Sequence, residues 1–214
     1  AMRRSPQSYQ HIEPEKIGNK MRVVVSDLSG RGNLLSKAEE YGMEVEGEEV
    51  VGVLNDIKEL ESRGFSFEAA EASVAIMLKR QEYGYKPPFE LIDFFVNVEH
   101  RDMRGIFAEA MVKVRVQGEV LHTAAEGNGP VNAMDNALRK ALMGYYPQIA
   151  RFHLSDYKVR ILDSDHGTEA ITRVLIDTRN STSRWSTFGA STNIIEASWR
   201  ALADSMEYGL MVAH

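Results

Sequence analysis

Apolar residues in the first part of the chain recur at the spacing of amphipathic helices. Two such stripes are separated by the short segment 63–66. There Gly64 can end one helix in a left-handed conformation and Ser66 can cap the next, so we expect a helical hairpin. Pro87 and Pro88 then break the helical pattern. The stripes are Val50, Val53, Leu54, Ile57 and Leu60, followed by Phe67, Ala70, Val74, Met77 and Leu78.

Beyond residue 88 the pattern changes to the two-residue period of half-buried strands. Alternation covers residues 91–98, 110–116 and 120–123, with Gly105 and Gly118 punctuating the turns. The next segment has Pro130 in its first turn, an apolar stripe and cations in its last turn. These features predict a helix that ends near Gly144, so three strands and one helix follow the hairpin.

This series of elements occurs twice in the sequence. Residues 91–94 (LIDF) match residues 154–157 (LSDY), and Ala133, Ala137 and Leu138 match Ala197, Ala201 and Leu202. We therefore predict an α+β fold, in which a helical linker subdomain over residues 1–88 precedes a duplicated βββα domain over residues 89–214. The repeats, 89–146 and 152–214, should pack around a pseudo-two-fold axis. Because each three-stranded sheet has two faces and only one helix, the uncovered surface favours a homodimer.

The turn before the first repeat's helix is the best candidate for a binding site. Gly127 and Gly129 let the backbone approach a ligand, while the helix start presents N–H groups and a positive dipole end that attract a carboxylate. Val131 and Ile194, which we take as its counterpart in the second repeat, offer apolar contacts, and Glu126 can accept from an ammonium group. The set suits a ligand the size of an amino acid. The alternative is a tight turn whose glycines serve only its backbone angles.

Composition narrows the function classes. The 214 residues are 43% hydrophobic and 26% charged, which are values of an ordinary globular protein. A net charge of -6 argues against nucleic acid as the main partner. The absence of cysteine excludes disulfides, zinc–thiolate sites and cysteine nucleophiles, and it fits a cytoplasmic protein. No apolar run is long enough for a membrane span or a signal peptide.

No catalytic constellation is visible. The six histidines are scattered without paired spacing, so we expect no metal site, and Ser26 and Ser29 have no histidine arranged nearby for a hydrolase triad. The glycine-rich turn at 30–33 precedes a helix but lacks the lysine of a phosphate loop, which leaves it as a loop and helix cap. Trp185 and Trp199 are expected to fill the core.

Several strings resemble a known enzyme family. Residues 8–19 and 25–33 are similar to the segment after the catalytic barrel in citramalate synthases, and residues 122–133, 156–163 and 193–199 look like the regulatory domain of that family. The resemblance is closer than to the related 2-isopropylmalate synthases. It implies an acyltransferase of branched-chain amino-acid biosynthesis that condenses acetyl-CoA with pyruvate on a barrel holding a divalent metal. That barrel is missing here, so we expect an inactive fragment without catalytic residues or cofactor. Tyr9 and His11 lie in the connecting segment and receive no role.

The resemblance also implies a feedback site. The turn that binds a branched-chain amino acid in similar domains matches Gly127, Asn128, Gly129, Pro130, Val131 and Asn132. The second copy, residues 190–195, lacks the glycines and the proline, so we expect it to complete the pocket or the dimer face, with Tyr157 and Ile194 as contacts.

Isoleucine is the expected effector. Leucine stays open, because the two ligands differ by one methyl position, worth about 1–3 kcal/mol in an apolar pocket. A dimerisation scaffold without ligand is another alternative. A double-stranded-RNA module is disfavoured because the helix start carries no cation.

Overall fold

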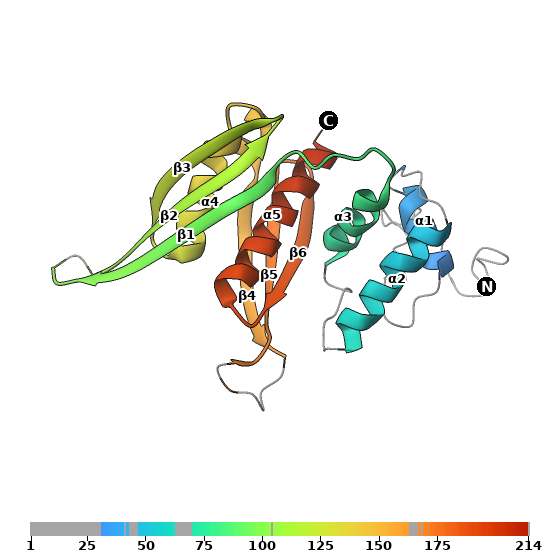
Figure 1. Cartoon of the computed structure of the whole chain (residues 1–214), viewed down its shortest axis with the longest axis horizontal. Coiled ribbons are helices and arrows are strands. Elements are labelled where there is room, and N and C mark those ends of the chain that lie inside the picture. The colour runs from blue at the N-terminus through green and yellow to red at the C-terminus, as the bar shows by residue number, and fades with distance from the viewer. Residues whose placement is uncertain are drawn as a thin grey trace.

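The computed structural model describes residues 31–40, 42, 47–62, 70–103, 105–162, 167 and 169–213. In this part of the chain, three helices precede two units that each contain three strands and a helix (Figure 1). The units have the same order of elements, and both sheets are antiparallel. The α+β class and the repeated βββα series are therefore confirmed, whereas the pseudo-two-fold axis stays a prediction.

The first helices are α1 (Arg31–Glu40), α2 (Gly47–Ser62) and α3 (Glu71–Gln81). They share a core that includes Leu34, Val53, Ile57, Val74 and Leu78, so the described residues of both predicted helical stripes are buried in this core or packed against it. The N-cap residue of α3 is Ala70, which makes no side-chain cap hydrogen bond, and the predicted cap at Ser66 lies outside the described residues. Gly64 and Phe67 lie outside the described residues, and the turn expected at 30–33 is already helical from Arg31 onward.

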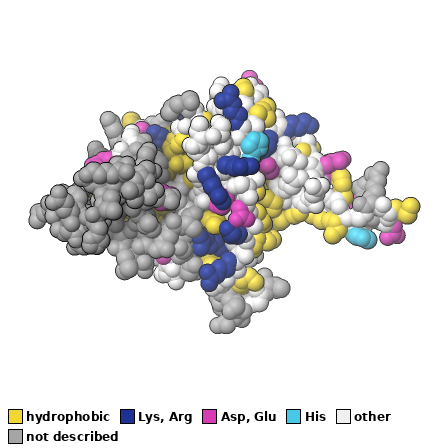
Figure 2. Space-filling model, turned by 180° about the vertical axis from the view of Figure 1, so that it is seen from behind, with side chains coloured by type: hydrophobic (Ala, Val, Ile, Leu, Met, Phe, Trp, Pro, Cys, Tyr) yellow, Lys and Arg dark blue, Asp and Glu magenta, His cyan; other side chains and the backbone are white. Residues whose placement is uncertain are grey.

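The first unit places a helix on one face of a sheet. Its strands are β1 (Glu90–Arg101), β2 (Gly105–Val116) and β3 (Glu119–Gly127), and its helix is α4 (Pro130–Leu142). Alternate residues of β2 are buried beneath α4, as the two-residue period predicted. The far ends of β1 and β2 project from the body, and Figure 2 shows hydrophobic side chains on this projection.

The second unit repeats this arrangement after a 3-10 turn at Pro147–Arg151. It consists of β4 (His153–Ile161), β5 (Thr172–Arg179), β6 (Arg184–Ser191) and α5 (Ile194–Val212). Helix α5 lies so close to β6 that a Cβ atom on Gly189 would stand 2.1 Å from the carbonyl oxygen of Ala197. Glycine at this position is therefore a requirement of helix–strand packing.

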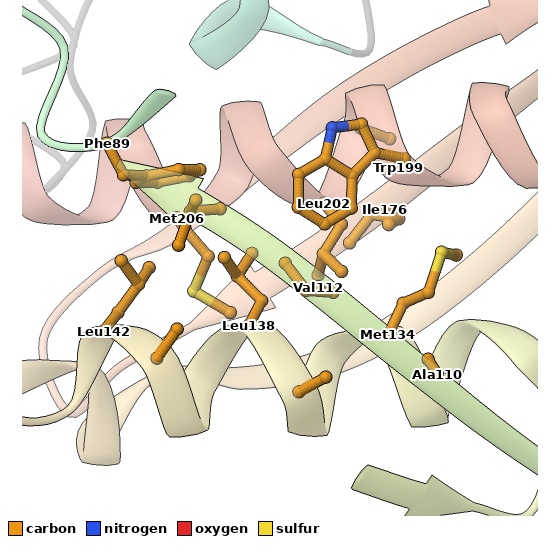
Figure 3. Close-up of a cluster of buried hydrophobic side chains, with 14 of the residues drawn as sticks. Phe89, Ala110, Val112, Met134, Leu138, Leu142, Ile176, Trp199, Leu202 and Met206 are labelled. Carbon is orange, nitrogen blue, oxygen red and sulfur yellow. The ribbon is translucent and has the colours of Figure 1, made fainter. Parts of the chain in front are cut away.

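The two units share one core. Figure 3 shows side chains of α4 and α5 facing each other across it, including Leu138, Leu142, Leu202 and Met206. Trp199 of α5 stacks on Phe94 of β1 with ring centroids 5.4 Å apart and an interplanar angle of 18°. Trp199 and Trp185 are both buried, which confirms their predicted role in the core. The helix of the second repeat thus packs on the first strand of the first repeat.

Helix α3 covers part of the second sheet. It packs on β6 and α5, and the hydroxyl of Ser73 accepts a hydrogen bond of 3.0 Å from the backbone N–H of Phe188. Because β6 is the edge strand of its sheet, this bond satisfies a group that points away from the ladder. The domain boundary after residue 88 stays a prediction. Helix α3, which precedes this boundary, packs directly on the second repeat.

Candidate functional site

The turn between β3 and α4 contains both glycines of the predicted site. Neither is among the glycines with positive φ, so backbone angles do not explain them. A Cβ atom on Gly127 would lie 2.4 Å from the backbone nitrogen of Ala133, which means that α4 can approach β3 only because residue 127 is glycine. Gly129 is extended, with φ of -168°, and a Cβ atom there would meet nothing within 4 Å. Gly127 thus serves packing, whereas Gly129 faces open space.

The start of α4 has no side-chain cap. Its N-cap residue is Gly129, its first residue is Pro130, and its first turn contains no acidic residue. The backbone N–H groups of Val131 and Asn132 come before the first intrahelical donor, Ala133, which bonds to the carbonyl of Gly129. An anion at this helix start would therefore meet two donors and the positive end of the helix dipole.

A cavity of about 520 Å³ lies beside the first turns of α4, and we call it the α4 cavity. Val131, Asn132 and Tyr157 line it, so the structure brings these three predicted residues together from α4 and β4. Gly127, Asn128, Gly129, Pro130 and Ile194 do not line it. The side chain of Asn132 accepts from the backbone N–H of Asn128 at 3.1 Å, and that bond holds the turn against the helix.

Ile194 is not the counterpart of Val131. The N-cap residues of the two helices are Gly129 and Asn193, so Ile194 corresponds to Pro130 and Ile195 corresponds to Val131. Ile195 and Val131 are both partly buried against the common core, whereas Ile194 is 44% exposed. The predicted pairing was therefore displaced by one residue.

The α4 cavity also contains an ion pair that the sequence analysis did not single out. Arg139 Nε donates to both carboxylate oxygens of Asp135, at 2.8 and 2.9 Å, and Arg139 Nη1 donates to the carbonyl of Ile149 at 3.0 Å. Burial raises the pKa of Asp135, and Arg139 opposes this shift. The signal in the sequence was an Asp-Arg pair four residues apart on a predicted helix.

The remaining wall of this cavity is apolar and ends at Tyr157. Phe152 and Leu154 lie at the start of β4 beside the ion pair. The hydroxyl of Tyr157 lies 2.8 Å from the Ser198 hydroxyl on α5, so the cavity wall is connected to the second helix. An apolar surface next to a charged pair and free N–H donors suits a small zwitterion with an aliphatic side chain.

A second cavity of about 470 Å³, the α5 cavity, occupies the corresponding place in the second repeat. Two of its lining residues, Phe89 and Leu91, correspond to Phe152 and Leu154 of the α4 cavity at an offset of 63 residues. Two others, Trp199 and Ala203, correspond to Asp135 and Arg139 at an offset of 64 residues. Where the α4 cavity has a charged pair, this one has the tryptophan that stacks on β1. Helices α2 and α3 also contribute to its wall.

The described residues contain neither a metal-binding cluster nor a helix that could cross a membrane. No three His, Asp or Glu side chains there are placed to hold a metal ion together. Among the helices described, none combines the length and the hydropathy needed to cross a membrane.

Two known protein families match this chain, each over a different range of residues. Residues 68–210 match the family described as LeuA allosteric (dimerisation) domain, and residues 1–64 match the homocitrate synthase post-HMGL domain-like family. The chain belongs to the LeuA allosteric (dimerisation) domain family. Residues 68–210 are thus a regulatory and dimerisation region, and this region begins before α3.

Particular relatives confirm the resemblance to citramalate synthases. The (R)-citramalate synthase of Geobacter sulfurreducens is 49% identical over 214 residues, which cover 98% of this chain and 40% of that protein. The (R)-citramalate synthase of Synechocystis sp. is 47% identical over 219 residues, with coverage of 98% and 40%. A 2-isopropylmalate synthase of Aquifex aeolicus is 28% identical over 205 residues, with coverage of 95% and 37%. The chain spans about 40% of the length of these citramalate synthases.

Proposed function

We propose that this chain is the feedback-regulatory part of a citramalate synthase and that it binds isoleucine at the start of α4. The observation that carries the proposal is an uncapped helix start beside the α4 cavity, within a domain of a family described as allosteric. Citramalate synthases are among the relatives of this chain, and the resemblance to that family implies feedback by a branched-chain amino acid.

The site offers a partner for each part of the ligand. The carboxylate meets the N–H groups of Val131 and Asn132, the ammonium group lies toward Asp135, and the aliphatic side chain packs on Phe152 and Leu154. Because Asp135 already has Arg139 as a partner, a bound ammonium would share that carboxylate. Binding then stabilises the contact between α4 and β4, which together line the cavity. This shifts the equilibrium of the complete enzyme between states of different activity.

Catalysis is assigned to a part of the enzyme outside this sequence. We propose that the complete protein condenses acetyl-CoA with pyruvate and water, with release of CoA, on a barrel that would hold a divalent metal, and that no residue of this chain holds that metal. The chain by itself is expected to be inactive.

The effector is tested by calorimetric titration of this chain with isoleucine, leucine and valine in separate experiments. Isoleucine should bind most tightly, and at about 100 times its dissociation constant it should raise the free energy of unfolding by about 2.7 kcal/mol. A preference for leucine would instead indicate the regulation expected of a 2-isopropylmalate synthase. If none of the three binds, the chain is a dimerisation scaffold and the effector proposal is wrong.

We also propose that the chain forms a homodimer through the helix-bearing faces of its sheets. Val98 and Ile106 of the projecting strands are 51% and 67% exposed, and Ile161 at the end of β4 is 56% exposed. These side chains lie on the same face of their sheet as buried residues. Val98 pairs with the buried Ala108, and Ile161 lies two residues beyond Val159, which pairs with the buried Val174. A second copy would cover these residues.

The dimer surface is tested by light scattering during size-exclusion chromatography. Ile161→Lys should lower the molar mass from dimer to monomer, because it places a charge in the proposed interface. Val120→Lys is the matched control, since Val120 is 48% exposed but pairs with Arg115 on the opposite face of the first sheet. Equal molar masses for both variants would show that this face is not the interface.

A further inference from the structure

Arg80 connects α3 to the second half of α5. Its Nη2 atom lies 2.7 Å from Asp204 Oδ1 and 2.7 Å from Glu207 Oε2, and its Nε atom donates to Glu207 Oε1 at 3.3 Å. The hydroxyl of Tyr85 also donates to Glu207 Oε1, at 3.0 Å. We call these four residues the α3–α5 joint. It ties the helix that precedes the first repeat to the helix that ends the second.

The joint is held by charge in a poorly solvated place. The side chains of Glu207 and Asp204 are only 4% and 17% exposed. Burial raises the pKa of Asp204 to about 6, although the nearby Arg80 guanidinium favours the charged form. Without Arg80, the two carboxylates would face each other with little water to screen them. Arg80 therefore contributes directly to how α5 and α3 fit together.

Apolar packing between α3 and α5 is interrupted beside the joint, although Tyr208 and Met211 of α5 pack against the core that contains Leu78 of α3. The α5 cavity lies directly beside the joint, and its wall includes Arg80, Asp204 and Glu207 together with Met77 of α3 and Ala203 of α5. Close-packed surfaces resist small displacements, whereas a cavity of about 470 Å³ leaves room for one helix to shift against the other. The ion pairs are thus directional contacts that hold the two helices together where the apolar packing is interrupted.

The other half of α5 contacts the α4 cavity. The Tyr157 hydroxyl, which belongs to the cavity wall, lies 2.8 Å from Ser198 Oγ, and Ser198 in turn donates to the carbonyl of Ile194 at 2.6 Å. From Ser198 to Asp204 is six residues of one continuous helix, or about 9 Å. A displacement of Ser198 is therefore passed to the joint by a rigid element.

We propose that α5 transmits the state of the α4 cavity to α3 through the α3–α5 joint, with Tyr157 and Ser198 at one end and Arg80 at the other. The inference rests on the proposed function, because the effector is expected to occupy the α4 cavity, and it adds the residues that carry the response. Arg80 and Ser198 act as positioning residues and do not touch the effector. Helix α3 then passes the conformational change of the regulatory domain to the residues that precede it in the chain.

The joint is first tested without any ligand, by hydrogen exchange of the α3 backbone amides in this chain. Ser198→Ala, Arg80→Gln and the double variant form a cycle, and coupling requires the exchange rates of the double variant to depart at least about threefold from the product of the single effects. Rates that multiply independently would overturn the proposal. Should Arg80→Gln fail to fold, Arg80→Lys keeps the charge while losing the forked geometry and replaces it in the cycle.

A matched control uses an ion pair elsewhere in the same repeat. Arg184 Nη2 lies 2.6 Å from Asp177 Oδ2 on the second sheet, away from α3. Arg184→Gln combined with Ser198→Ala should show independent effects on α3 exchange. Coupling of the same size in this control would overturn the assignment of the response to the joint.

The ligand experiment separates the two proposals. Saturating isoleucine should slow α3 exchange in the wild type, while Ser198→Ala should bind isoleucine and lose this response. If isoleucine binds but the exchange rates of the wild-type α3 amides do not change, the proposal that the joint transmits the response is wrong. Absence of isoleucine binding would overturn the effector assignment instead, and the ligand-free cycle would still decide whether the joint is coupled.

Discussion

The two repeats differ in how the backbone N–H groups at the start of their helix are satisfied. Each has a strand that turns into a helix, and each helix start leaves backbone N–H groups without intrahelical partners. In the second repeat the side chain of Asn193 accepts from Ile195 and Glu196, at 2.9 and 3.3 Å. In the first repeat the equivalent position is Gly129, which has no side chain to offer. Only the first helix start is open to an external anion.

The cavity walls differ in the same direction. Asp135 and Arg139 leave polar groups along the α4 cavity, whereas the corresponding Trp199 and Ala203 bring a stacked aromatic pair and a methyl group to the α5 cavity. A duplicated fold can therefore keep its core in both copies while only one copy keeps the features of a ligand site.

Gly129→Asp gives the largest expected effect. The new carboxylate would occupy the anion position and cap α4 itself, so isoleucine affinity should fall by at least about 100-fold while the chain stays folded and gains up to about 1 kcal/mol. Calorimetry and thermal unfolding measure the two effects. Gly129→Ala is the control, because a Cβ atom there meets open space. Unchanged isoleucine binding in Gly129→Asp would show that the effector lies elsewhere.

Gly127→Ala should reduce stability in contrast to Gly129→Ala. The added Cβ atom would stand 2.4 Å from the Ala133 nitrogen, so α4 must move away from β3 at a cost of about 1–3 kcal/mol. Urea unfolding of the two variants gives the comparison directly. Equal midpoints for both would mean that the helix accommodates the methyl group without loss.

Asn193→Ala should affect the second repeat alone. Loss of the cap on α5 should lower the free energy of unfolding by about 1 kcal/mol, and isoleucine affinity should not change. Denaturant unfolding and the same titration measure the two quantities. A weakened affinity would show that the second helix start takes part in the site.

Asp135→Asn should give the smallest effect on stability, seen as a change in its pH dependence. Burial raises the pKa of Asp135 above its ordinary value of 3.8, so the folded chain holds that proton more firmly than the unfolded chain. The stability that this provides is present at low pH and is lost as the pH rises through the folded-state pKa. Wild type minus Asp135→Asn, measured by urea unfolding from pH 4 to pH 7, should therefore decline, and parallel profiles would contradict the assignment.

The elements of the fold could be predicted from the sequence because each depends on a local period. Residues 108–116 alternate between buried and more exposed along β2, and the stripe of Met134, Leu138 and Leu142 is fully buried on α4. The start of α3 at Glu71 was less predictable, because its N-cap residue Ala70 makes no side-chain cap hydrogen bond and so gives no local capping signal.

The candidate site was predictable only in part. Gly129, Val131 and Asn132 stand out as a helix start, and this reading needs no tertiary information. Asp135 and Arg139 did not stand out, because an ion pair four residues apart is usually a solvated surface feature and its burial depends on β4 from the other repeat. Residues from two repeats meet in the cavity, so its lining required the three-dimensional packing.

The hydrogen bond from the Phe188 N–H to Ser73 has a practical consequence for shortening the chain. A version that starts after residue 88 would retain both sheets but uncover the border of β6 and the side chain of Phe188, which is 9% exposed when α3 is present. Such a bare border is a template for intermolecular strand pairing and aggregation. Truncations intended for binding studies should therefore begin ahead of Glu71.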